Sequence, residues 1–192
     1  MISTLGDSML NDIDIIQHHD MIDPFNTEQV QPVSYDVLLG DSYKRLRGAE
    51  PRGIPLPRNI TRPSESDWES YEHVNEIRIR AHEFLLASTL ETVHIPTRVV
   101  ARLEGKSTIA RQGLIVHAAG LIDPGFHGQI TLELHNETNT ELILPVGTRI
   151  GQLTFIHLVE APMHAYGDKA LNSHYQGQTG ATAPRGGTHV ES

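Results

Sequence analysis

GQITLELHN, residues 128–136, decides the fold class, because apolar and polar residues alternate along it without a break. Successive side chains of a β-strand point to opposite faces of its sheet. One face of this predicted strand carries Ile130, Leu132 and Leu134, and the other carries Gln129, Thr131, Glu133 and His135. Taken alone, the polar face fits a solvated outer surface, or a partly dry pocket in which the Glu133 carboxylate transfers protons.

Five further segments of this β-like kind surround it, and Gly, Pro or Asn residues separate them. They are HEFLLASTLETVHIP (82–96), RVVARLE (98–104), GLIVHAAGLID (113–123), TELILPVG (140–147) and RIGQLTFIHLVE (149–160). The six strand candidates recur at roughly ten-residue spacing, and the chain shows neither a β-α-β alternation nor an internal repeat. This pattern predicts a mainly β protein, an all-β barrel or jelly roll.

The N-terminal third is expected to add a helix, a strand and a long loop. Residues 7–17 carry apolar side chains at helical spacing after Asp7 or Ser8, which predicts a short capped helix. Residues 33–41, VSYDVLLGD, are typical of a strand that ends in a glycine turn. Residues 48–70 are rich in Pro, Gly, Arg and Ser, which predicts a long surface excursion.

The C-terminal segment from residue 161 onward is rich in glycine and other small residues. Such a segment cannot bury enough surface to order itself, so it is expected to dock on another part of the protein or to stay loose. The predicted organisation is one barrel domain with its N-terminal helix over residues 1–160, followed by an arm over residues 161–192.

Composition excludes several classes of function. The net charge of −9 argues against a nucleic-acid or anionic-membrane surface, because binding there would oppose the overall field. The chain has no cysteine, which removes disulfides, thiolate metal sites and cysteine nucleophiles. We find no apolar run near 18 residues and no secretory leader, so a soluble cytoplasmic protein is expected.

The stretch GKSTIARQGL, residues 105–114, has the composition of an anion site. Its glycine, two hydroxyls and two cations suit a phosphate, although the order of residues is not that of a Walker loop. The twelve histidines form no H-x-H or H-E-x-x-H motif, and the zinc deaminase signature needs cysteines. No G-x-S-x-G elbow of a serine hydrolase occurs.

Five segments together are more specific than any one of them. In order they are SYDVLLGD (34–41), LEGKSTIARQGL (103–114), AGLIDPGFHGQITLELHN (119–136), GTRIGQL (147–153) and YQGQTG (175–180). They resemble the five motifs of the dCTP deaminase and trimeric dUTPase superfamily. The resemblance implies a distorted jelly-roll β-barrel, a homotrimer with active sites at subunit interfaces, and a C-terminal arm that closes over the bound nucleotide.

The resemblance also assigns roles to residues. Deaminases of this family have a glutamate where dUTPases have a small hydrophobic residue, so Glu133 would shuttle protons while water attacks C4 of cytosine. Ser107 and Arg111 would hold the water and the glutamate. The expected substrate-binding residues are Lys106 and Thr108 at the triphosphate, the Ala119 carbonyl at the water, Asp123 at the 3′-hydroxyl, and Tyr166, His174 and Gln178 from the arm.

The nucleotide product is implied by a separate resemblance. Gly120 after Ala119, together with YQGQTG, resembles the bifunctional enzymes that deaminate dCTP and also release pyrophosphate to give dUMP. Leu121 departs from the aromatic residue usual at its place, and His174 replaces the usual lysine. The alternatives are a deaminase that releases dUTP, a dUTP diphosphatase alone, and a non-catalytic nucleotide-binding jelly roll. Mg²⁺ is expected with the triphosphate, zinc is not, and dTTP is a candidate feedback inhibitor.

Overall fold

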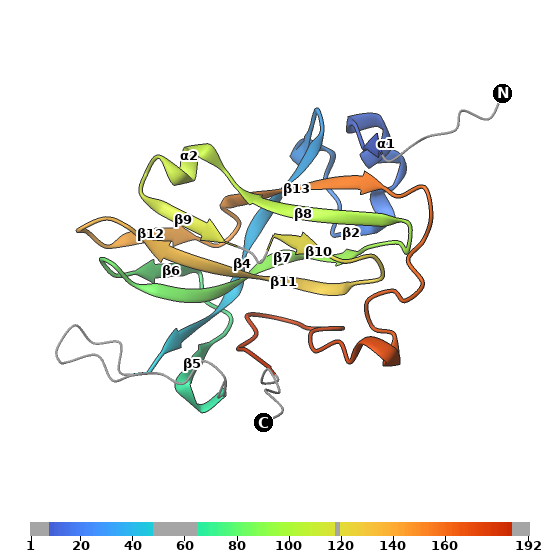
Figure 1. Cartoon of the computed structure of the whole chain (residues 1–192). Helices are drawn as coiled ribbons and strands as arrows, with labels where there is room; N and C mark the ends of the chain where they lie inside the picture. Colours follow the sequence, from blue (N-terminus) through green and yellow to red (C-terminus); the bar gives the residue numbers. More distant parts are fainter. Residues whose placement is uncertain (1–7, 48–64, 118–119, 186–192) are drawn as a thin grey trace.

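The computed structural model describes residues 8–47, 65–117 and 120–185, and these residues form a mainly β molecule (Figure 1). The N-terminal elements are β1 (Ser8–Met9), α1 (Asp12–Gln17), β2 (Ile22–Asp23), β3 (Val30–Gln31) and β4 (Ser34–Leu46). The central elements are β5 (Trp68–Tyr71), β6 (Glu76–Ile79), β7 (Phe84–His94), β8 (Val99–Gly105), α2 (Ser107–Ala110) and β9 (Leu114–His117). The last strands are β10 (Leu121–Ile122), β11 (His127–Asn136), β12 (Leu142–Pro145) and β13 (Arg149–His157).

The strands form two antiparallel sheets that are joined through β4. In the first sheet β10, β8, β13 and the start of β4 lie in that order. In the second sheet the end of β4 is followed by β7, β11 and β9. A separate ribbon of β12 and β6 closes one end. This is the distorted jelly-roll barrel that the sequence predicts, and all six strand candidates form strands.

Gly40 lies at the point where β4 passes from one sheet to the other. The pairing of β4 with β13 covers positions 35–38, and its register with β7 shifts after Leu39. A Cβ atom on Gly40 would lie 2.6 Å from Ser88 Oγ and 2.7 Å from the Thr89 carbonyl oxygen. The predicted glycine turn is therefore wrong: the glycine lets two strands approach closely inside a continuous strand.

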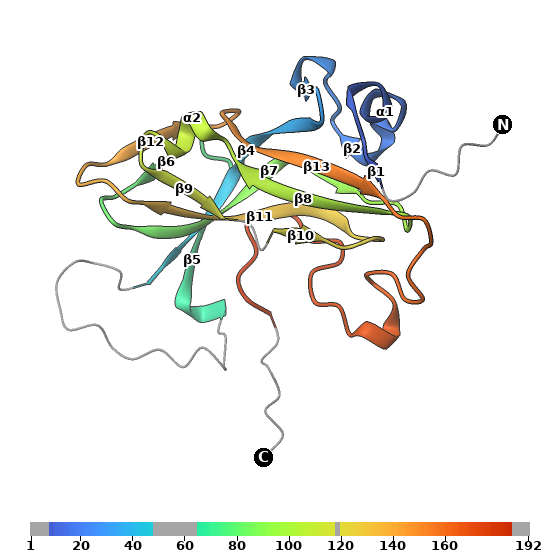
Figure 2. The same ribbon diagram turned by 45° about the horizontal axis from the view of Figure 1, so that its top comes forward.

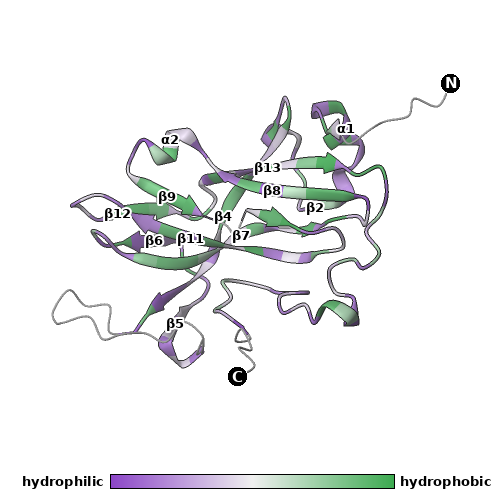
Figure 3. Ribbon diagram, viewed as in Figure 1, coloured by the Kyte–Doolittle hydropathy of each residue, from purple (hydrophilic) through white to green (hydrophobic). Residues whose placement is uncertain are grey.

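The core lies between the two sheets and follows the alternation seen in the sequence. Ile130, Leu132 and Leu134 of β11 are buried, while Thr131 and Glu133 are only partly buried. Apolar residues gather on the strands of both sheets in Figure 3. The largest fully buried side chains include Tyr35, Phe155, Leu39, Leu132 and Ile150.

The N-terminal helix is shorter than predicted. Its cap is Asn11, whose side chain accepts a hydrogen bond from Asp14 N at 3.1 Å. Ser8 lies instead in β1, and Asp7 lies outside the described residues. Asn11 is favoured at the cap position because its side-chain oxygen satisfies a helix-terminal N–H, and here Asn11 N also donates to Asp14 Oδ2 at 3.2 Å.

The predicted surface excursion over 48–70 is only partly described. Residues 48–64 lie outside the described ranges, and 65–67 form a 3₁₀ turn. Residues 68–70 belong to β5, which pairs with the end of β4, so the loop prediction is wrong for these residues. The pairing comes from a distant strand, which the local composition of the segment does not reveal.

The C-terminal arm docks on the barrel. From residue 158 to 185 the chain runs beneath β11 in both orientations of the ribbon (Figures 1 and 2). Its one short helix in this range is a 3₁₀ turn, Lys169–Leu171. Ala181 and Ala183 are buried against Trp68 and Leu86 of the second sheet. Of the two possibilities left open by composition, the structure has the docked arm.

Candidate active site

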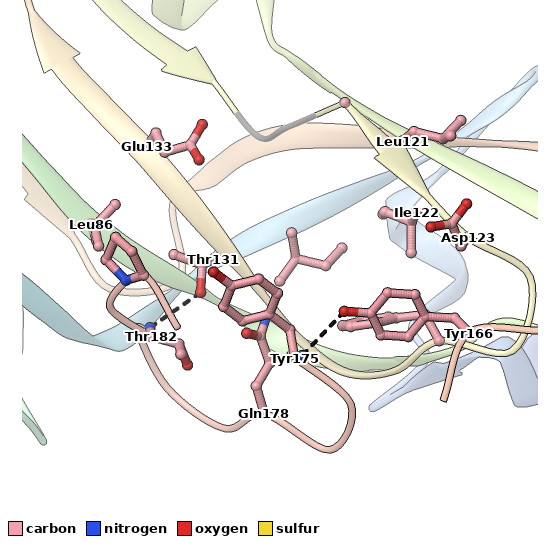
Figure 4. A pocket seen from close by; sticks show the side chains of 14 residues that line it. Leu86, Leu121, Ile122, Asp123, Thr131, Glu133, Tyr166, Tyr175, Gln178 and Thr182 are labelled. Atoms are coloured by element: carbon pink, nitrogen blue, oxygen red, sulfur yellow. Dashed lines mark hydrogen bonds between the residues drawn. The ribbon is translucent and has the colours of Figure 1, made fainter. Parts of the chain in front are cut away.

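A cavity of about 280 Å³ lies between β10, β11 and the arm (Figure 4). Strand β11 supplies Thr131 and Glu133 to its wall, and the turn after β10 supplies Asp123. The arm supplies Tyr166, Tyr175, Gln178 and Thr182. The structure thus brings together four of the residues expected at the site, Glu133, Asp123, Tyr166 and Gln178, from segments far apart in the sequence.

Glu133 has the environment of a proton-transfer group. Burial raises the pKa of its carboxyl above the usual value, because the charged form loses solvation, and the nearby His117 partly offsets this rise. His117 is the cross-strand neighbour of Glu133 on β9. Within the described part of the chain the Glu133 carboxylate has no hydrogen-bond partner, so it remains available to a ligand or water.

A second hollow, of about 450 Å³, adjoins the first. Leu86, Glu133 and Pro184 border both, so that the carboxylate stands between them. The second hollow is mostly apolar, and its wall includes Trp68, Phe84 and Ile115 together with His117 and His135. The open apolar side next to Glu133 is a surface that a further chain segment could cover.

The turn after β10 positions Asp123 and Tyr166 at one end of the cavity. Tyr166 N donates to the Pro124 carbonyl at 2.7 Å, and its ring lies edge-on to Phe126 at 5.5 Å. Gly125 has φ +91°, and a Cβ atom there would lie 2.9 Å from Ala165 Cβ. A glycine is therefore required where the arm crosses this turn.

Gln178 is held firmly and yet keeps one polar atom unused. Its Nε2 donates to the Gln129 carbonyl at 2.7 Å, and Gln129 N donates to the Gln178 carbonyl at 3.0 Å. The Nε2 contact fixes the orientation of the amide, because a flipped amide would place two oxygens together. Oε1 is buried and has no hydrogen-bond partner among the described residues.

The residues of the expected phosphate motif lie elsewhere on the chain. Among the described residues, the lining of this cavity does not include Lys106, Ser107 or Thr108 at the start of α2, or Arg111 just after it. Lys106 Nζ pairs instead with Asp36 Oδ1 at 2.5 Å, and Arg149 lies 3.3 Å from the same buried carboxylate. A single chain therefore carries the expected site in two separate parts.

Two other expected residues are not placed in the cavity. His174 is exposed and lies edge-on to Tyr175, with ring centroids 6.3 Å apart. Ala119 lies outside the described residues, so its role stays a prediction.

Three residues that line the cavity, Thr131, Tyr175 and Thr182, were not predicted from the sequence. The alternation in residues 128–136 places Thr131 on the same polar face as Glu133, so Thr131 was predictable from the sequence. Nothing in the local sequence indicates that Thr182 lines a site.

The fold and the cavity define a class of protein, a jelly-roll barrel with an arm-covered ligand site around one desolvated carboxylate. The chain belongs to the dCTP deaminase-like family, whose model matches residues 9–158. This confirms the family resemblance seen in the sequence. Within the described ranges no helix is long and apolar enough to span a membrane.

Similar proteins carry one recurrent name. The chain is 40% identical over 168 residues to "dCTP deaminase, dUMP-forming" of Rhodococcus opacus (strain B4), covering 84% of this chain and 85% of that protein. It is 42% identical over 180 residues to the protein of that name from Beutenbergia cavernae, with 88% and 91% covered. For the Bifidobacterium longum (strain DJO10A) protein the identity is 40% over 191 residues, with 92% and 93% covered.

A solved structure supports the fold independently. The crystal structure of 2′-deoxycytidine 5′-triphosphate deaminase from Agrobacterium tumefaciens matches with a TM-score of 0.63 at 19% sequence identity. The match covers 80% of this chain and 49% of that one, so this chain corresponds to about half of the larger protein. At this identity the likeness shows the shared fold.

Proposed function

We propose that this protein hydrolytically deaminates dCTP at C4 of cytosine and also releases pyrophosphate, so that the product is dUMP. The observation that carries the proposal is Glu133, a desolvated carboxylate at the wall of an arm-covered cavity. Membership of the dCTP deaminase-like family and the shared name of the relatives support the substrate and the product.

In the proposed reaction Glu133 accepts a proton from water as the water oxygen attacks C4. The glutamate gives this proton to the ring nitrogen N3, then takes the proton of the new C4 hydroxyl and passes it to the departing amine, so that ammonia leaves as the C4 carbonyl forms. The raised pKa favours both transfers, because it brings the carboxyl group closer to the working pH than an ordinary glutamate, so that it can accept a proton and return it. Positioned acid–base groups contribute about 10²- to 10⁴-fold to such rates.

The cavity residues are proposed to hold the nucleoside part. Asp123 would accept a hydrogen bond from the 3′-hydroxyl, and Tyr166 lies beside it on the same wall. Gln178, which lines the cavity from the arm, would meet the nucleotide there. The roles of these residues come from the family resemblance, and their position in the cavity wall supports them.

The phosphate end of the substrate is proposed to come from a neighbouring subunit. Lys106, Ser107, Thr108 and Arg111 carry the donors and cations suited to a triphosphate, yet they do not line the cavity of their own chain. A homotrimer with sites at its interfaces would bring them to Glu133, across the apolar hollow beside it. In this arrangement Ser107 and Arg111 would also hold the attacking water.

Mg²⁺ is proposed to bind with the triphosphate, whose oxygens are the hard ligands this ion prefers, and to neutralise phosphate charge. Within residues 8–47, 65–117 and 120–185 no three His, Asp or Glu side chains converge as a metal site, and we assign the ion no protein ligand. The proposal places the protein in the cytoplasm, with dTTP as a candidate feedback inhibitor at the nucleotide site.

A second candidate is a deaminase that releases dUTP unchanged. What favours dUMP is Gly120, which borders the cavity with φ +75° and whose segment resembles that of the bifunctional enzymes. A non-glycine residue would be strained at this angle. A dUTP diphosphatase alone is a third candidate, but its reaction does not require a proton-shuttling glutamate at position 133.

One incubation separates these candidates. The purified protein is given dCTP and Mg²⁺, and dUTP, dUMP, ammonia and pyrophosphate are resolved over time. We expect ammonia and pyrophosphate in equal amounts, with little free dUTP. Stoichiometric dUTP without pyrophosphate would reduce the activity to deamination, and turnover of dUTP without ammonia from dCTP would refute the deaminase.

A further inference from the structure

Three successive backbone amides of the arm are bound by side chains of the barrel. Gly180 N donates to Gln129 Oε1 at 2.6 Å, and Thr182 N donates to Thr131 Oγ1 at 3.2 Å. Between them, Ala181 N donates to Ser42 Oγ at 2.9 Å. Gln129 and Thr131 lie on the polar face of β11, whereas Ser42 lies on β4. Side chains from two strands, β4 and β11, thus accept hydrogen bonds from the backbone of the arm.

Ser42 is the least expected of these three contacts. It is 7% exposed, and its Oγ lies 2.9 Å from Ser88 Oγ of β7, so the hydroxyl is held in place within the sheet. The wall of the cavity is formed in part by residues of the arm and of β11, and Ser42 is not among the lining residues. Ser42 can therefore act on a bound ligand only at a distance, through the arm at Ala181 or through Ser88, the cross-strand neighbour of Thr131.

The fit of the arm at Ser42 is close. Gly180 has φ +64°, and a Cβ atom on it would lie 3.0 Å from Ser42 Oγ. A side chain at this position would both strain the backbone and push the arm away from the hydroxyl. Glycine therefore permits the contact, and the neighbouring Ala181 and Ala183 are then buried against Leu86 and Trp68.

This contact acts together with those of Gln129 and Thr131 to hold the arm beside β11. The arm residues Gln178 and Thr182 lie on either side of it in the sequence, and both line the cavity with Glu133. Figure 4 shows Thr182 bonded to Thr131 and Tyr175 bonded to Tyr166 beside the same cavity. A shift of the arm by one residue would remove these side chains from the wall.

We propose that Ser42 is a positioning residue for the proposed reaction: its hydroxyl latches the arm at Ala181 and so holds the arm side of the substrate cavity in register. The kinetic part of this inference rests on the proposed function. The latch itself is a property of the protein without substrate, and it is measurable without any activity.

The test compares Ser42→Ala with Ser34→Ala, an equally buried serine of the same strand whose side chain has no hydrogen bond to the described part of the arm. Amide hydrogen exchange is measured on both variants and on the natural protein without nucleotide. Loss of the acceptor leaves Ala181 N–H unpaired in a buried position. We expect exchange at residues 180–182 to become about 5- to 150-fold faster in Ser42→Ala only, with the barrel strands unchanged.

Gly180→Ala tests the same contact from the arm, where a substitution leaves the barrel sequence intact. It should accelerate exchange at 181 and 182 as Ser42→Ala does. With dCTP as substrate, both variants should raise KM by a similar factor, whereas Ser34→Ala should leave KM unchanged. Exchange at 180–182 equal in Ser42→Ala and Ser34→Ala would overturn the latch. If the natural protein proves inactive on dCTP, the exchange result still decides the latch, while the proposed function fails separately.

Discussion

Replacing Glu133 by glutamine tests the centre of the proposed chemistry. The two side chains have nearly the same shape, and within the described residues the carboxylate has no hydrogen-bond partner to lose. The cavity wall should therefore keep its form, and nucleotide affinity should change by less than about tenfold. What disappears is the ability to accept a proton from water and return it to the amine.

The expected loss follows from the size of general acid–base catalysis. A positioned group of this kind contributes about 10²- to 10⁴-fold, so deamination should fall by at least about 10²-fold. That corresponds to a barrier higher by at least about 2.7 kcal/mol. Because binding is retained, the loss should fall on kcat rather than on KM.

Stability provides a second readout of the same substitution. The folded-state pKa of Glu133 is raised, so the folded protein binds more protons than the unfolded chain between the two pKa values, and the contribution of Glu133 to stability falls as pH rises through this window. Glutamine removes this cost. The melting temperature of Glu133→Gln should therefore exceed that of the natural protein at pH 7, and the difference should vanish well below the ordinary carboxyl pKa.

The assay measures ammonia release from dCTP together with nucleotide binding by calorimetry, and melting curves at pH 3.5 and 7. A matched control is Glu137→Gln, a glutamate near the second hollow on the same side. Near-normal ammonia release from Glu133→Gln, with intact binding, would refute the role of this glutamate. Equal loss in the Glu137→Gln control would show that the effect is not specific to Glu133.

Four further outcomes are expected. His117→Gln should move the acid limb of the kcat/KM profile to higher pH, because the group that lowers the Glu133 pKa is lost. Asp36→Asn should reduce the free energy of unfolding in urea by about 1.5–3 kcal/mol, since charged donors lose their buried acceptor. His174→Lys should sharpen the preference for dCTP over dCMP in calorimetry, because the added cation attracts the more highly charged triphosphate. Deletion of 167–192 should abolish dCTP turnover while circular dichroism and sedimentation show an intact folded assembly; normal turnover would make the arm a linker.

Much of the fold was predictable from the sequence because a strand is recognised by a local pattern. Side chains alternate with period two, so the core face of β11 follows from residues 128–136 alone, and the structure buries the predicted residues. The family was recognisable for a similar reason, since its motifs are short and continuous. Glu133 could thus be singled out before its surroundings were known.

Tertiary structure alone decided the surroundings. Ser42 and Ala181 are separated by 139 positions, and Lys106 and Asp36 by 70, so no local pattern connects them. In the sequence Gly40 is typical of a turn, yet in the structure it lies inside a continuous strand, where β7 approaches closely. The raised pKa of Glu133 depends on its burial in the folded protein and on His117 across the strand pair. Desolvation and hydrogen bonding act across space, and the sequence specifies them only through the packing of the whole chain.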